Sequence, residues 1–426
     1  MEIIQTVTRT SHSSIFDQSS IYAYNSDGSM VEGYPLEVYY PIDGTPTIGD
    51  IDGDSKNEIV VLSGKMVYAW DTDGDADKIE WGSYRHDNYN TGNYDFVEPC
   101  FTDNNPITVS NTIIWSDSRR IYSDIIIETG AKLTIKGNLG MSEDVAIYVK
   151  PGAELKVEGG SIRAACDGQW QGIEVWGNSD ADQNDLDQNG YLKQGIVTLI
   201  DATIEDAFKG VLLGRTLPVQ YPEELSDYNG GIISANNSTF RNNEYSVMFK
   251  PYSYVSVSSI DDCHFEFDDN PVNGIQLKNF VSLYDYEYLS INGCNFEKKT
   301  PLTEQELEEF SGIYSIDSHV SVDGLCVGEY TSNGCTEIQN TYFSGLFYGI
   351  YAANIASARS IDVRHSTFDE NVTGIYLGQV DYSEVVLNTF IIPDGLSNTD
   401  KSGLYIDMST GFIVQQNDFN ANAWVA

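Results

Sequence analysis

The sequence has few basic residues. It contains 23 Lys and Arg against 64 Asp and Glu, so its formal net charge is 23 − 64 = −41 at pH 7. A surface of this charge repels phosphate polyanions and acidic lipid headgroups, which argues against binding to nucleic acid or to an anionic membrane. The charge does not indicate disorder, because 41% of the residues are hydrophobic, enough for a large core.

Long apolar runs and cysteines are also scarce. No apolar run approaches the roughly 20 residues needed to cross a bilayer, so we expect no transmembrane segment. Six cysteines in 426 residues, without a CxxC motif or zinc-type Cys/His spacing, predict neither a zinc site nor a fold that depends on disulfides. Cys326 and Cys335 are close enough in sequence to pair, whereas Cys263 and Cys294 are expected to be buried in one column of small side chains.

Neither end of the chain has the features expected of a complete secreted protein. The first residues contain no basic segment followed by an apolar one, so no signal peptide is recognisable. The last repeat ends without an obvious cap, although open sheet edges are usually covered. We therefore expect the chain to be part of a longer polypeptide that carries a secretion signal and an anchoring or sorting domain outside these residues.

Residues 1 to 95 have the pattern of short strands separated by acidic turns. A strand at Tyr22 runs into a turn at residues 25 to 28, and a strand at Tyr68 runs into a second turn at residues 71 to 74. The spacing of 46 residues between the two tyrosines is typical of one four-stranded propeller blade.

Between these strands lies an acidic loop that is bent at Gly53. Calcium takes six to eight oxygen ligands, and alternate residues of a tight loop point inward. Without a cation, the carboxylates of this loop would repel one another, so their regular spacing predicts a calcium site. The alternative is a solvated acidic turn. The predicted ligands are Asp50, Asp52, Asp54 and Glu58, with the carbonyl of Lys56. A second candidate metal site comprises Asp71, Asp73, Asp75 and Asp77. It lacks one ligand, because Ile79 stands at the position that corresponds to Glu58 in the first site.

The segment from Asp50 to Val61 resembles the calcium loop of the integrin-alpha-type FG-GAP repeat, also called the VCBS repeat. The flanking segments, residues 22 to 35 and 81 to 92, resemble the final blades of such propellers in bacterial secreted proteins. This resemblance implies calcium binding and a β-propeller-like blade module. One or two blades cannot close a propeller, so we expect a partial module.

After a linker over residues 96 to 110, a repeat with the length of a β-helix coil begins. Residues 130 to 135 match residues 152 to 157, which lie 22 residues later. A turn followed by Phe recurs at gaps of 22 to 31 residues, with one gap of 47 that equals about two coils. This spacing predicts about ten or eleven coils of a parallel β-helix, with strands ~4.8 Å apart and a buried ladder of phenylalanines. The predicted ladder is Phe240, Phe265, Phe296, Phe343, Phe368, Phe390 and Phe419.

Residues 170 to 178 and the Phe-containing coils resemble right-handed parallel β-helix repeats of the pectate-lyase type, which bacterial surface and secreted proteins often carry. The resemblance implies this fold for residues 111 to 426 and leaves the chemistry open, because the fold hosts lyases, hydrolases, epimerases and non-catalytic adhesins. The lyase and polygalacturonase signature motifs are not recognisable. The grouping of Arg359, Arg364 and His365 beside Asp362 and Asp369 is better explained by surface ion pairs than by catalysis.

A second repeated motif, Gly-Ile/Leu-Tyr, predicts a column of tyrosines on the outside of the helix. These residues are candidates for contact with glycans, and the alternative is a stabilising stack along the sheet. The column comprises Tyr314, Tyr351, Tyr376 and Tyr405.

The sequence thus predicts an all-β protein: a partial FG-GAP-like module (residues 1 to 95), a linker (96 to 110) and a right-handed parallel β-helix (111 to 426). We expect a non-catalytic, calcium-stabilised structural or adhesion protein outside the cell or on its surface, whose partners are polysaccharides or cell-surface glycans. The alternative is a polysaccharide-degrading enzyme, a lyase or glycoside hydrolase that acts on acidic glycans.

Overall fold

In a computed structural model, the chain divides into two compact units, Met1–Pro99 and Cys100–Ala426. The structure describes residues 2–8, 19–42, 44–52, 56–75, 79, 82–84, 100–216, 226–268, 271–272, 275–300, 310–331, 334–392 and 401–421. Their regular structure is almost entirely β, apart from the short 3-10 turn η2 (Ser226–Tyr228). Within these ranges no helix has the length and apolar character needed to cross a membrane.

In its described residues, the first unit contains two antiparallel three-stranded sheets around a small apolar core. One sheet has the order β1 (Glu2–Thr8), β2 (Ser19–Asn25), β3 (Leu36–Val38), and the other β4 (Thr47–Gly49), β5 (Lys56–Ser63), β6 (Met66–Asp75). Ile21 and Val38 from the first sheet pack in one cluster with Ile59 and Val61 from the second. Tyr22 and Tyr68, the two predicted repeat positions, therefore lie in different sheets.

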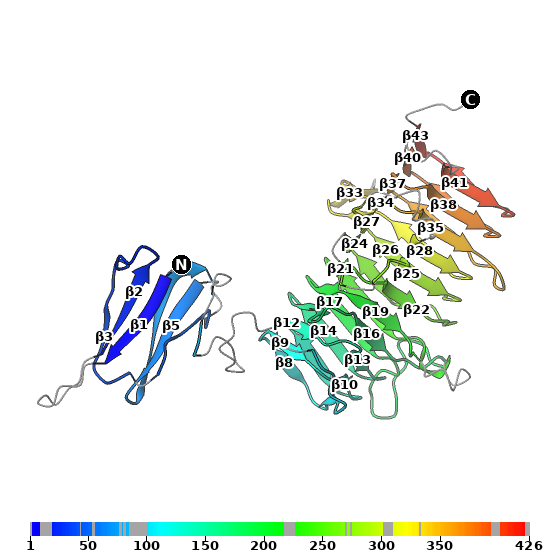
Figure 1. Ribbon diagram of the computed structural model, residues 1–426. Helices are drawn as coiled ribbons and strands as arrows, with labels where there is room; N and C mark the ends of the chain where they lie inside the picture. Colours follow the sequence, from blue (N-terminus) through cyan, green and yellow to red (C-terminus); the bar gives the residue numbers. More distant parts are fainter. Residues whose placement is uncertain are drawn as a thin grey trace, which may run out of the picture. The chain divides into compact units, whose positions relative to one another are not determined.

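The second unit is a right-handed parallel β-helix, as the sequence predicts (Figure 1). Among the described residues it has three parallel sheets of 11 strands each, and each coil contributes one strand to every sheet. Successive strands of a sheet are equivalent segments of neighbouring coils, so equivalent side chains form columns along the helix axis.

We name the three sheets by their position in the coil and by their columns. The tyrosine sheet contains β7 (Ile107–Val109), β10 (Ile125–Ile127), β13 (Ala146–Val149), β16 (Trp170–Val175), β19 (Ala207–Leu213), β22 (Tyr245–Phe249), β25 (Asn279–Tyr284), β28 (Ser311–Ile316), β35 (Tyr348–Ala353), β38 (Thr373–Gly378) and β41 (Ser402–Asp407). The middle sheet contains β8 (Ile113–Trp115), β11 (Lys132–Ile135), β14 (Glu154–Glu158), β17 (Ile196–Ile200), β20 (Ile232–Asn236), β23 (Ser259–Asp261), β26 (Leu289–Asn292), β29 (Val320–Asp323), β36 (Ile361–Arg364), β39 (Glu384–Val386) and β42 (Ile413–Gln415). The phenylalanine sheet contains β9 (Arg119–Ile121), β12 (Asn138–Met141), β15 (Ser161–Ala164), β18 (Thr203–Glu205), β21 (Thr239–Arg241), β24 (His264–Phe267), β27 (Asn295–Lys298), β34 (Thr341–Ser344), β37 (Ser366–Asp369), β40 (Thr389–Ile392) and β43 (Asp418–Ala421).

The interior of the helix contains the predicted phenylalanine ladder. From Phe240 to Phe419, neighbouring rings stack nearly parallel, with centroids 4.6 to 4.9 Å apart. The inner rings of the ladder are almost fully buried, and inward Ile, Leu and Val side chains of the other two sheets complete the core. The alternation of inward apolar and outward polar residues along each strand produces this packing.

The bend between the middle and the phenylalanine sheet uses a left-handed backbone conformation in successive coils. Asn237 and Asp262 adopt it with φ of 46° and 52°, and His365 adopts it with φ of 43°. Asn and Asp tolerate this conformation because their short polar side chains bond locally. The same bend position is taken by different residue types along the helix, including Gly293 with φ of 61° and Gln416 with φ of 55°.

The gap of 47 residues between Phe296 and Phe343 corresponds to one coil, and the prediction of two coils is wrong. β27 pairs directly with β34, so the two phenylalanines belong to adjacent coils. Part of the extra length forms an arm of two small antiparallel pairs, closed by the predicted Cys326–Cys335 disulfide. The strands of the arm are β30 (Leu325–Cys326), β31 (Tyr330–Thr331), β32 (Gly334–Cys335) and β33 (Ile338–Gln339).

A second disulfide, Cys100–Cys166, joins residues 66 positions apart. The sequence predicts a linker over residues 96 to 110 and little role for disulfides, whereas Cys100 and strand β7 both belong to the β-helix unit. Cys263 and Cys294 are free and buried in adjacent coils, and the backbone N–H of Cys263 lies 3.3 Å from the Cys294 sulfur. These two thiols confirm the predicted column.

Candidate functional site

The first candidate site is the acidic turn between β4 and β5. Asp50, Asp52 and Glu58 each place one carboxylate oxygen within 4.8 Å of the others. Glu58 is only 2% exposed. One of its oxygens accepts the backbone N–H of Ile51 at 2.7 Å, while the other is buried with no hydrogen-bond partner in the described part of the chain. An unpaired buried carboxylate oxygen beside two further carboxylates fits a hard cation such as calcium.

The other two predicted ligands of this site are Asp54 and the carbonyl of Lys56. Asp54 lies outside the described residues. Lys56 begins β5, and its ammonium group contacts the Asp75 carboxylate at 2.7 Å and the Asp73 carbonyl at 3.2 Å.

The second candidate metal site is not the turn that the sequence predicts. Asp71, Asp73 and Asp75 lie in strand β6, because the hairpin pairing with β5 continues as far as Asp75. The carboxylate of Asp75 is paired with Lys56, and Asp77 lies outside the described residues. The ion pair with Lys56 opposes a role for Asp75 as a metal ligand.

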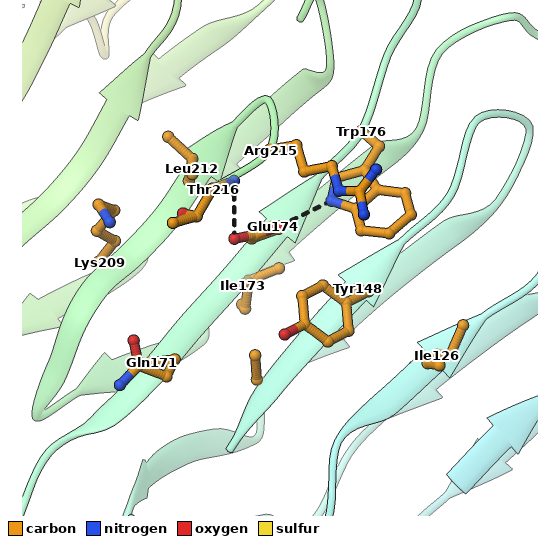
Figure 2. A pocket seen from close by; sticks show the side chains of 11 residues that line it. Ile126, Tyr148, Gln171, Ile173, Glu174, Trp176, Lys209, Leu212, Arg215 and Thr216 are labelled. Carbon is orange, nitrogen blue, oxygen red and sulfur yellow. Dashed lines mark hydrogen bonds between the residues drawn. The ribbon is translucent and has the colours of Figure 1, made fainter. Parts of the chain in front are cut away.

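A pocket of about 420 Å³ lies on the outer face of the tyrosine sheet, over β10, β13, β16 and β19 (Figure 2). Its walls combine apolar, aromatic, acidic and basic side chains. The lining residues are Ile126, Ala146, Tyr148, Gln171, Ile173, Glu174, Trp176, Lys209, Leu212, Arg215 and Thr216.

A β-bulge in the pairing of β16 with β19 shapes this pocket. Gly172 pairs with Lys209, but the next residue, Ile173, pairs with Val211, so β19 has one extra residue at this point. Gly172 adopts φ of 105°, and a Cβ at this position would lie 1.5 Å from the carbonyl oxygen of Lys209. Only glycine fits here, and the bulge sets the positions of Lys209 and Glu174 in adjacent strands.

Glu174 is the central acidic group of the pocket. Its carboxylate accepts hydrogen bonds from the indole N–H of Trp176 at 2.8 Å and from the backbone N–H of Thr216 at 3.0 Å (Figure 2). Burial raises the pKa of Glu174, although these two donors and the nearby Lys209 act in the opposite direction. The carboxyl group is therefore easier to protonate than an exposed glutamate.

Two cations line the pocket on either side of Glu174 in the view of Figure 2. Burial lowers the pKa of Lys209, against the attraction of Glu174, and its ammonium group lies 4.2 Å from the ring centroid of Phe208. The guanidinium of Arg215 lies 4.7 Å from the ring of Trp176 and 4.8 Å from that of Tyr228. Both cations are thus held on aromatic faces at the pocket wall.

The predicted tyrosine column exists on the same sheet. Tyr314, Tyr351, Tyr376 and Tyr405 stack nearly parallel, with ring centroids 4.8 to 5.5 Å apart. Because their faces lie against one another, the rings present edges and hydroxyl groups outward. The column is therefore a stack along the sheet, as the structural alternative predicts, and a glycan would meet hydroxyls instead of ring faces.

The basic residues that the sequence places in one coil do not form a common site. Arg359 pairs with Glu287 at 2.6 Å and Arg364 pairs with Glu384. His365 lies 2.7 Å from an Asp323 oxygen. These separate pairs agree with the interpretation as surface ion pairs.

Sequence reasoning missed the pocket. Glu174 and Trp176 lie in the segment 170 to 178, which carries the resemblance to β-helix repeats, and their alternation along the strand could have placed both on the outer face. Lys209 and Arg215 follow more than 30 residues later, so their approach depends on the register between coils.

Comparisons with known proteins identify no family. No family model matches the chain, and no curated protein matches it. Among solved structures, a mutant tailspike protein of E. coli bacteriophage HK620 in complex with a pentasaccharide matches with 11% identity, over 74% of this chain and 59% of the tailspike, at a TM-score of 0.30. A double mutant of the periplasmic alginate epimerase AlgG matches with 10% identity, over 74% and 85% of the two chains, at a TM-score of 0.24. The chain thus spans less than two thirds of the tailspike, and at these TM-scores neither similarity bears on what it binds.

Proposed function

We propose that this protein is a non-catalytic, extracellular or surface-exposed β-helix protein that binds an acidic glycan in the pocket of the tyrosine sheet. The observation that carries the proposal is that two cations, Lys209 and Arg215, line one pocket together with Trp176 and Tyr148, in a chain whose net charge is −41. In such a chain, a local pair of cations is a selective feature for an anionic ligand.

The lining of the pocket suits a charged sugar. The Tyr148 ring packs against the C–H face of a sugar, and Trp176 holds Arg215 beside it, while Gln171 and Thr216 offer hydrogen-bonding groups to the sugar hydroxyls. Lys209 and Arg215 pair with a carboxylate or sulfate group on the sugar. The volume of about 420 Å³ lies within the usual range of ligand pockets.

Two disulfides support a location outside the cytoplasm. Cys100–Cys166 and Cys326–Cys335 require an oxidising compartment to form and persist. The strongly acidic composition also favours solubility in a calcium-containing extracellular medium.

A panel of acidic and neutral polysaccharides tests the glycan proposal: polygalacturonate, alginate, hyaluronan, xylan and dextran. Binding is measured by affinity electrophoresis, and cleavage by unsaturated-product absorbance and new reducing ends. We expect binding to at least one acidic polymer, no cleavage, and loss of binding in Trp176→Ala. The exposed Tyr330 on the arm supplies the control, Tyr330→Ala, which should bind normally. Failure of the folded protein to bind any acidic polymer would refute the proposal.

A polysaccharide lyase or hydrolase is the second candidate, favoured by one observation. Glu174 and Lys209 have pKa values displaced toward each other, Glu174 upward and Lys209 downward, mainly by burial. Such shifts are typical of acid and base groups at catalytic sites. If the protein cleaves a polymer of the panel, and the cleavage rate falls at least about 100-fold in Glu174→Gln, the protein is an enzyme that uses Glu174.

Acidic pH is expected to strengthen binding to an acidic glycan. As pH falls from 8 to 5, Glu174, whose pKa is raised above its usual 4.5, loses negative charge. This loss makes the pocket more positive, so the dissociation constant for polygalacturonate should fall several-fold. An affinity that is constant or weaker at pH 5 would contradict this expectation, and Glu174→Gln should show a smaller pH effect.

We also propose that calcium binds at Asp50, Asp52 and Glu58 and stabilises the first unit. A ligand present at 100 times its dissociation constant adds about 2.7 kcal/mol, which for a unit of this size raises the melting temperature by about 10 °C. Differential scanning calorimetry with 1 mM CaCl₂ and with EDTA measures the shift. Glu58→Gln should remove the shift, whereas Glu32→Gln, an exposed carboxylate of the same unit, should retain it. Equal melting curves in calcium and EDTA would reject the site.

A further inference from the structure

The pocket and the tyrosine column are connected by one line of paired residues on the tyrosine sheet. Tyr148 pairs with Glu174, and Glu174 with Leu212 in the next strand. The same register continues through Met248 and Ser282 to Tyr314. Leu212, Met248 and Ser282 are themselves covered, with exposures of 1%, 7% and 0%, so the surface between the pocket and the column is formed by the side chains that flank this line.

Aromatic side chains extend along this face between the pocket and the column. The ring of Phe208 contacts the ammonium group of Lys209, and its centroid lies 6.2 Å from that of Tyr245 in the next strand. Tyr284 lies on the strand after that of Tyr245, and its ring centroid is 6.0 Å from that of Tyr314, the first member of the column. Tyr245 and Tyr284 are not in register with each other: Tyr245 precedes Met248 by three residues and Tyr284 follows Ser282 by two, so they flank the line on opposite sides. We call this set the aromatic track: Phe208, Tyr245, Tyr284, Tyr314, Tyr351, Tyr376 and Tyr405.

The outer faces of the other two sheets have a different character. On the phenylalanine sheet, Arg241 pairs with Glu205 and Glu266, and Lys299 pairs with Glu266 at 2.6 Å. On the middle sheet, Lys132 pairs with Glu154 at 2.6 Å. Ion pairs between neighbouring coils occupy those faces, whereas on the tyrosine sheet aromatic rings do.

We propose that the ligand is a linear polysaccharide whose chain runs from the pocket along the aromatic track, parallel to the helix axis. This inference rests on the proposed binding of a glycan in the pocket, and it specifies that the ligand is a polymer. Neighbouring strands are ~4.8 Å apart, close to the length of one sugar unit in an extended chain. The six strand steps from β19 to β41 span about 29 Å, the length of about six sugar units, and the last four of these strands carry one column tyrosine each.

The chemistry of the track fits the hydroxyl groups of such a chain. Because ring faces in the column are stacked on one another, each tyrosine presents a phenolic O–H that both donates and accepts hydrogen bonds. These hydroxyl groups recur once per coil, and this spacing matches a polysaccharide whose sugar units recur at a similar length. A single sugar in the pocket would not reach the column.

Galacturonic acid and its oligomers of two to ten units, measured by isothermal titration calorimetry at constant pH, test the proposal. We expect affinity to rise with length over roughly six added units and then to become constant. The double variant Tyr351→Phe/Tyr376→Phe keeps both rings in the stack and removes two hydroxyls. It should weaken binding of the decamer roughly tenfold and leave binding of the monomer unchanged. Tyr330→Phe, which changes an exposed tyrosine on the arm, should bind every length normally.

The outcomes separate the track from the pocket. Equal affinity for monomer and decamer, both lost in Trp176→Ala, would overturn the track and leave the pocket in place. Absence of binding to every length, or binding that Trp176→Ala leaves intact, would overturn both. Analytical ultracentrifugation tests whether the track binds a second copy of the chain. Concentration-dependent dimers that dissociate in Tyr351→Phe/Tyr376→Phe would show this, and they would also overturn the proposal.

Discussion

Replacement of Gly172 by alanine is expected to abolish glycan binding and to cost about 3–5 kcal/mol of stability. An alanine Cβ would lie 1.5 Å from the carbonyl oxygen of Lys209, and φ of 105° is unfavourable for any residue except glycine. The left-handed conformation alone costs about 1–3 kcal/mol. Relief of the contact requires β16 and β19 to separate at the bulge, which displaces Glu174 from Lys209 and opens the pocket.

Gly190 provides a matched control for this variant. It also has a positive φ, 84°, but a Cβ there would meet no atom within 4 Å. Gly190→Ala therefore isolates the conformational cost, and we expect a smaller loss of stability and normal binding. Urea unfolding and titration with polygalacturonate measure the two effects. A Gly172→Ala protein that binds with wild-type affinity would show that the bulge does not position the pocket.

Replacement of Phe343 by alanine is expected to destabilise the β-helix by about 3–5 kcal/mol. Phe343 is fully buried and stacks at 4.7 Å on Phe296 and at 4.8 Å on Phe368. The variant loses both ring contacts and leaves a cavity in the interior, because the strands above and below are held in register by their own pairing. Phe343→Leu, which fills part of the space, should lose less.

Hydrogen exchange can locate this effect along the helix. Each coil of a solenoid contacts only its neighbours, so faster exchange should concentrate in β27, β34 and β37 and decrease with distance. Phe412, which is 42% exposed, gives the control Phe412→Ala with little expected change. A loss below about 1 kcal/mol for Phe343→Ala, or faster exchange spread evenly over all coils, would contradict the role assigned to the ladder.

The features that the sequence predicts best are those that repeat. The phenylalanine spacing predicts the β-helix and the ladder because each coil places the same residue type in the same column. The gap of 47 residues between Phe296 and Phe343 shows the weakness of this reasoning. Two coils and one coil with an inserted arm have the same length in sequence, and only strand pairing distinguishes them.

The features that the sequence does not predict depend on contacts between distant residues. Cys100 and Cys166 are 66 positions apart, and nothing local marks them as partners. Lys209 reaches Glu174 only through the register of β16 and β19, which includes a bulge. Asp71 and Asp73 have the composition of a turn, but pairing with β5 holds them in a strand. In each case, tertiary pairing determines the outcome more than local composition.

The Cys100–Cys166 bridge has a mechanical consequence. Tension applied to the two ends of the β-helix unit would peel its coils apart one at a time, since each coil is held only by its neighbours. The segment between the bridged cysteines, residues 101 to 165, bears none of that load, because the covalent bond bypasses it. Reduction of the bridge would release roughly 220 Å of extra contour length. Under force, the β-helix unit with an intact Cys100–Cys166 bond is therefore expected to reach a shorter full extension than the unit with this bond reduced.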